Sequence, residues 1–112
     1  MNQQSFYASL AALLAAAALS PAGADQHTSQ ALQHATEAAS SAGDSKAVGE
    51  HAAEALKHID AAKASNPGAV KQLEQSETDL KAAITNANRF NTDTAAQEAK
   101  DAKSHLDEAA RK

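Results

Sequence analysis

Cysteine and tryptophan are absent from this chain of 112 residues, and it contains only one Tyr and two Phe. The lack of cysteine excludes a disulfide framework, a thiolate metal site and a cysteine nucleophile. Aromatic and β-branched residues are sparse, and no segment alternates apolar with polar residues, so strands are not expected. The hydrophobic fraction of 43% is mostly alanine, which favours helices but buries little area. We therefore expect one all-α domain with a modest core.

No basic stripe is present either. Ten Lys and Arg residues are scattered among fourteen Asp and Glu, which gives a net charge of −4 and argues against nucleic acid as a partner. The sequence also lacks His-Glu-x-x-His, a Gly-rich phosphate loop and Gly-x-Ser-x-Gly. We therefore expect a protein that is not an enzyme.

The first 24 residues have the layout of a signal peptide. A polar start precedes an apolar run from Leu10 to Leu19, and Ser20-Pro21 and the small residues Ala22-Gly23-Ala24 follow. The start carries no Lys or Arg. A membrane anchor is the alternative, but the apolar run is shorter than the ~20 residues that span a bilayer. We predict cleavage after Ala24, a domain over residues 25–112, a periplasmic or secreted location, and no membrane association after cleavage.

Turn signals divide residues 25–112 into helical segments. The expected helices run from Thr28 or Ser29 to about Ala42, from an Asp44 or Ser45 cap to about Ser65, from Pro67 to the polar segment 86–91, and onward from a Thr92 or Asp93 cap.

Apolar residues recur at intervals of three and four in the last three segments, as expected for helices with one buried face. Short connections then predict an up-down-up-down antiparallel four-helix bundle, which we expect to be a monomer. The expected core positions are Val48, Ala52, Ala55, Leu56, Ile59, Ala62, Ala69, Leu73, Leu80, Ile84, Ala87, Ala95, Ala99, Ala102, Leu106 and Ala109.

A His-x-x-Glu unit recurs in three of the four segments. It occurs in His34-Ala-Thr-Glu-Ala38, in His51-Ala-Ala-Glu-Ala-Leu-Lys-His58 and in His105-Leu-Asp-Glu-Ala109. On a helix, residues three apart share a face and can reach toward one ion. Residues seven apart are ~10.5 Å apart along the axis, which is too far for two ligands of one metal. Each unit is therefore a two-ligand clip: His34 with Glu37, His51 with Glu54, and His105 with Glu108, with His58 as an alternative partner for Glu54.

A hairpin centred near Ala42 and Gly43 places His34 level with His51 and His27 level with His58. These histidines lie at the edge of the apolar stripe, so they either converge on one seam or point apart, according to bundle handedness. Imidazole and carboxylate donors without thiolates favour Cu(II), with Ni(II) and Zn(II) also possible. Because metal competes with protons for imidazole, binding should weaken below neutral pH.

At these units, above all His51-Ala-Ala-Glu-Ala-Leu-Lys-His58-Ile-Asp-Ala-Ala-Lys-Ala-Ser65, the chain resembles the small metal-binding protein (SmbP-like) family over roughly residues 27–112. The resemblance implies an exported four-helix protein that binds divalent metals, notably copper, in metal buffering. The family is richer in histidine than this chain, which has five and none in the third segment. By motif position it implies as ligands His27, His34, Glu37, His51, Glu54, His58, His105 and Glu108.

Other interpretations remain open at this level. A single His-x-x-Glu on a wet helix face is common, and the repeats are also consistent with duplicated helices that keep a pattern without a site. The main alternative function is a helical envelope interaction or structural module with solvated histidines. A lipid-surface protein is a further alternative, although the polar faces are mixed in charge and the apolar faces are small.

Overall fold

The structure is a computed structural model, and it describes residues 26–112. The predicted signal peptide, residues 1–24, lies outside the described residues. The described part of the chain forms the helices α2 (Gln26–Ser40), α3 (Ser45–Ser65), α4 (Val70–Asn88) and α5 (Thr92–Ala110), with a short 3₁₀ turn, η1 (Pro67–Ala69), before α4. No strand is present among these residues. The predicted all-α class is confirmed.

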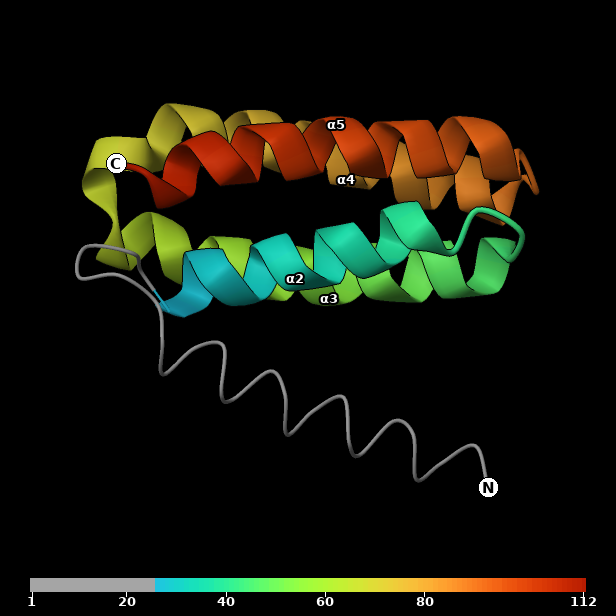
Figure 1. Cartoon of the computed structure of the whole chain (residues 1–112), viewed down its shortest axis with the longest axis horizontal. Helices are drawn as coiled ribbons and strands as arrows, with labels where there is room; N and C mark the ends of the chain where they lie inside the picture. The colour runs from blue at the N-terminus through green and yellow to red at the C-terminus, as the bar shows by residue number, and fades with distance from the viewer. Residues whose placement is uncertain (1–25) are drawn as a thin grey trace, which may run out of the picture.

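The four helices form an up-down-up-down antiparallel bundle, as predicted (Figure 1). Helix α2 packs beside α3 and α5, and α4 packs beside α3 and α5, so each helix has two close neighbours. In Figure 1, α2 and α3 form one layer and α4 and α5 form the other. None of the described helices is both long and apolar enough to cross a bilayer. The layer of α2 and α3 contains four of the five histidines.

Local signals start and stop the central helices as the sequence predicted. Asp44 caps α3, because its side-chain oxygen accepts a hydrogen bond from the Ala47 N–H at 3.1 Å. Helix α3 ends before Asn66, whose buried side chain donates to the Ala109 carbonyl at 3.3 Å. This bond joins the turn between α3 and α4 to the C-terminal end of α5. Pro67 starts a 3₁₀ turn, so the first turn of the third segment is tighter than the α-helix expected there.

Other helix ends differ from the prediction. Thr28 and Ser29 lie inside α2 instead of capping it, because Thr28 is buried on the core face of that helix. Helix α2 also ends at Ser40 instead of Ala42.

At the start of α5 the cap position is Asn91, not Thr92 or Asp93. The Asn91 amide instead donates to the Asn86 side chain at 3.2 Å, and the preceding residue, Phe90, has a left-handed φ of 60°. The turn between α4 and α5 is therefore built on Asn86 and Phe90.

The core consists mostly of alanine side chains, with a few larger apolar ones. The predicted stripes of α3, α4 and α5 are buried, except that Leu56 and Ile84 are only partly buried. Ser76 is also buried, and its hydroxyl donates to the Gln72 carbonyl at 3.0 Å. Because alanine side chains are short, neighbouring helices approach closely, and side chains at the edges of the stripes can meet across a seam. The largest fully buried apolar side chains are Ile59, Leu73, Leu80, Leu106 and Val48.

Candidate metal centre

The histidines of α2 and α3 converge on one seam. The His27 ring lies 6.0 Å from the His58 ring and the His34 ring 6.1 Å from the His51 ring, measured between ring centroids. These are the two pairs that the hairpin register predicted to be level. A diagonal pair is closer still, since the rings of His34 and His58 are 5.5 Å apart. The handedness of the bundle, which the sequence left open, therefore brings the four imidazoles together. We call this row the histidine seam.

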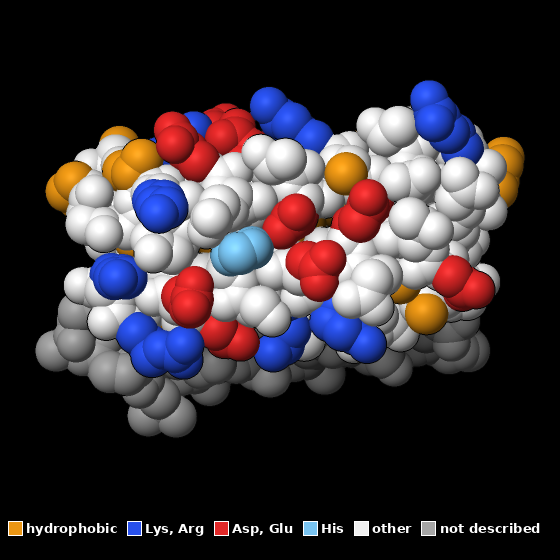
Figure 2. All heavy atoms as spheres, turned by 90° about the horizontal axis from the view of Figure 1, so that it is seen from above, with side chains coloured by type: hydrophobic (Ala, Val, Ile, Leu, Met, Phe, Trp, Pro, Cys, Tyr) orange, Lys and Arg blue, Asp and Glu red, His pale blue; other side chains and the backbone are white. Residues whose placement is uncertain are grey.

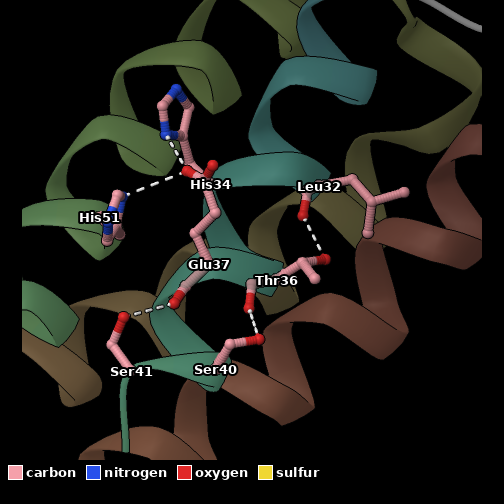
Figure 3. Close-up of polar contacts among 7 residues, drawn as sticks. All are labelled: Leu32, His34, Thr36, Glu37, Ser40, Ser41 and His51. Carbon is pink, nitrogen blue, oxygen red and sulfur yellow. Dashed lines mark hydrogen bonds and ion pairs between the residues drawn. The ribbon is translucent and has the colours of Figure 1, made fainter. Parts of the chain in front are cut away.

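Glu37 connects two histidines from different helices (Figure 3). Its Oε1 lies 3.3 Å from His34 Nδ1 on its own helix and 3.2 Å from His51 Nδ1 on α3. The side chains are partly buried, with 20% of His34, 34% of Glu37 and 36% of His51 exposed. One donor atom from each lies within 4.8 Å of the others, a spacing that could hold one metal ion. We call these three residues the Glu37 group.

Neighbouring hydroxyl groups do not compete for the Glu37 carboxylate. Thr36 and Ser40 donate to helix carbonyls at 2.8 and 2.9 Å, and the Ser41 hydroxyl donates to the backbone carbonyl of Glu37 at 2.8 Å (Figure 3). Such bonds to the preceding turn are usual for Ser and Thr within helices. The carboxylate remains directed at the two imidazoles.

A second set of donors consists of His34, Glu54 and His58, again with atoms within 4.8 Å of one another. We call it the Glu54 group. Its carboxylate is already engaged, because the Lys57 ammonium donates to Glu54 Oε2 at 3.2 Å. This hydrogen bond lowers the pKa of Glu54 below its ordinary value, against a smaller opposing effect of burial. An ion that binds Glu54 must therefore displace Lys57 or share the carboxylate with it.

Burial lowers the pKa of His58, and the neighbouring His34 and His27 lower it further by charge repulsion. These effects favour the neutral form of His58, and a neutral imidazole keeps a lone pair for a metal. Among the described residues, Nδ1 of His27 and Nδ1 of His34 are buried without a hydrogen-bond partner, although the latter lies near Glu37. Buried nitrogens without a hydrogen bond are uncommon. A bound cation would satisfy the His34 nitrogen, so this donor set fits a metal ion.

The structure pairs the predicted ligands differently from the clips. His34 and Glu37 do lie together, but His51 contacts Glu37 of the other helix, and Glu54 is grouped with His58, its alternative partner. His27 reaches the seam through its ring contact with His58 but belongs to neither three-residue group. The sequence clips join donors within one helix, whereas both groups in the structure join α2 to α3.

His105 lies apart from the seam, on the face formed by α4 and α5. Its Nε2 is 3.6 Å from Asp79 Oδ2 on α4, while Glu108, its expected partner, is exposed beside Arg111 and Lys112. Figure 2 views this face and shows acidic side chains around a histidine. Burial raises the pKa of Asp79, and the nearby His105 opposes that effect.

No group of three or more metal-binding side chains within residues 26–112 includes His105 or Glu108. Asp79 is not among the partners that the sequence patterns predicted for His105. The register of the hairpin formed by α4 and α5 could have predicted this contact, because it brings Asp79 within about one helical turn of the level of His105.

No curated protein and no solved structure shows significant similarity to the chain. A family model described as small metal-binding protein matches residues 2–109. Because this match spans almost the whole chain, the protein belongs to the small metal-binding protein family.

Proposed function

We propose that the protein reversibly binds a divalent transition metal at the histidine seam, with Cu(II) preferred, and acts as a metal buffer outside the cytoplasm. The observation that carries the proposal is the Glu37 group, in which one carboxylate oxygen lies within 3.3 Å of two imidazole nitrogens from different helices. The family to which the chain belongs supports metal as the cargo.

The donor set supports copper in particular. The two groups offer imidazole nitrogen and carboxylate oxygen, and the chain has no cysteine that would favour Cu(I). For such donors, affinity among divalent ions is highest for Cu(II), with Ni(II) and Zn(II) below it. The partly exposed side chains of the Glu37 group support exchange with solvent, because water can replace a ligand without unfolding the helices.

Export is supported by the N-terminal sequence. The apolar run and the small residues before Asp25 have the layout of a signal peptide, and the family match includes this stretch. N-terminal sequencing of protein from a periplasmic or secreted fraction should begin at Asp25. An intact Met1 on all of the protein would contradict export by cleavage.

The test of metal binding is calorimetric titration of the purified protein with Cu(II), Ni(II) and Zn(II). A variant with His34→Ala, His51→Ala and His58→Ala removes the seam, and alanine at these helical positions preserves helix propensity. The matched control is His105→Ala, which removes a histidine away from the seam. We expect saturable binding by the wild type and the control, tightest for Cu(II), and loss of that binding in the triple variant.

Equal weak binding by the wild type and the triple variant would contradict metal binding at the seam. The protein would then be better described as a helical envelope module, the alternative that the sequence left open.

A further inference from the structure

His34 belongs to both of the three-residue groups. Its ring lies between the two histidines of α3, 6.1 Å from His51 and 5.5 Å from His58. The two α3 histidines are two turns apart, ~10.5 Å along the axis, so no single ion can contact both, since two ligands of one metal must lie within ~4.4 Å. The seam therefore contains two sets of donors, which we call stations, one at each α3 histidine, and His34 of α2 belongs to both.

The chemistry of imidazole limits this shared ligand. A neutral imidazole carries a proton on one ring nitrogen and a lone pair on the other, so it donates to one metal at a time. Two divalent ions bound to the two nitrogens of one ring would also repel each other, because both carry a double positive charge and only the ring separates them.

Building on the proposed function, we propose that the Glu37 group and the Glu54 group are alternative stations for a single metal ion, and that His34 is the ligand common to both. Moving from one station to the other exchanges Glu37 and His51 for Glu54 and His58. The seam is then a short transfer track that holds one ion, not two independent sites.

The two stations are unequal. Among the described residues, the Glu37 carboxylate has ion-pair contacts only with the imidazoles of His34 and His51. Glu54 is held by the Lys57 ammonium at 3.2 Å, and the Lys57 side chain is 72% exposed. An ion therefore enters the Glu37 group without displacing another cation, whereas it displaces Lys57 from Glu54. The ion therefore prefers the Glu37 group. When an ion leaves the Glu54 group, Lys57 can pair with Glu54 again.

The experiment counts Cu(II) ions bound by the purified protein, by calorimetric titration. All variants carry His105→Ala, so that the count reports only the seam. One variant removes the Glu37 station (Glu37→Gln with His51→Ala), a second removes the Glu54 station (Glu54→Gln with His58→Ala), and a third removes the shared ligand (His34→Ala). Circular dichroism checks that each variant keeps its helices.

We expect one Cu(II) per chain in the His105→Ala parent and still one in each station variant, with weaker binding when the Glu37 station is removed. The His34→Ala variant should lose the ion. Electron paramagnetic resonance of the parent should show a mononuclear Cu(II) signal.

Two ions in the parent and one in each station variant would show independent sites and overturn the shared-ligand proposal, while leaving metal binding at the seam intact. Two magnetically coupled ions would overturn it as well, since His34 would then bridge them. A parent that binds no Cu(II) would overturn the proposed function itself, and the transfer track with it.

Discussion

The imidazoles of His34 and His58 lie in nearly parallel planes, 5° apart, with 5.5 Å between their centroids. His34 is on α2 and His58 is on α3, so their contact depends on the register of the two helices across the seam. The separation is within the range of offset aromatic pairs. Because the rings come from different helices, a metal ion bound at the seam would join α2 to α3 and should raise the free energy of unfolding.

Glu37→Gln should weaken Cu(II) binding by at least about tenfold, because even ligand-supporting groups contribute that much at metal sites. The substitution keeps the shape of the side chain and removes the charge that faces His34 and His51. Calorimetric titration measures the change. Glu50→Gln is the control, since Glu50 is exposed and paired with Lys46 at 3.7 Å. Equal affinities of the Glu37 variant and the wild type would contradict a role for this carboxylate.

Lys57→Ala should strengthen Cu(II) binding at the Glu54 group, because it removes the ammonium that occupies Glu54. The effect is best measured in a His51→Ala background, in which the Glu37 group is incomplete. We expect a gain of a few-fold, since an exposed ion pair contributes at most about 1 kcal/mol. Lys46→Ala, which alters an exposed lysine away from the seam, should leave the affinity unchanged. A weaker affinity after Lys57→Ala would argue against this competition.

Bound metal should stabilise the bundle, because the seam exists only when α2 and α3 are packed together. At free Cu(II) of about one hundred times Kd, the free energy of unfolding should rise by about 2.7 kcal/mol. For a domain of this size, the expected rise in Tm is about 10 °C or more. Thermal unfolding followed by circular dichroism measures the shift. In the His34→Ala variant Cu(II) should give no such shift, and an equal shift there would place the ion elsewhere.

The metal-free protein should lose stability as the pH falls below about 6.5. The unfolded chain protonates His58 near its ordinary pKa of 6.5, whereas the folded protein does so only at lower pH, because burial and the neighbouring histidines lower the pKa of His58. The unfolded state therefore binds more protons in this window, and the free energy of unfolding decreases until the pH passes below the folded pKa. Denaturant unfolding at several pH values should show a flatter dependence for His58→Gln. An unchanged slope would contradict this cause.

The ion pair between Lys63 and Glu77 should stabilise the packing of α3 against α4. The Lys63 ammonium donates to Glu77 at 2.9 Å and holds the pKa of Glu77 below its ordinary value of 4.5. Its contribution is therefore complete above pH 4.5 and is lost as the pH falls through the lower folded pKa. Glu77→Gln should reduce the free energy of unfolding at neutral pH, and the difference from wild type should vanish in acid. Glu50→Gln, at an exposed pair, should have a smaller effect.

Much of the bundle could be predicted from the sequence because its signals are local. The stripe from Val48 to Ala62 repeats at helical intervals, and Asp44 and Pro67 mark the ends of helices through their own side-chain chemistry. The same local logic failed at Thr28, which looks like a cap but is buried in α2, because packing against the core decides which polar residue faces inward.

The sequence by itself determined that the histidines lie at the edges of the apolar stripes, and which histidines of the first hairpin are level. Only the tertiary structure decided that α2 and α3 turn these edges toward each other. It also decided that Glu37 contacts His51 of the other helix and that His105 contacts Asp79 instead of Glu108. The physical reason is that helical periodicity fixes the direction in which a side chain points around the axis of its own helix. The rotation and handedness of neighbouring helices depend on how all four stripes pack together.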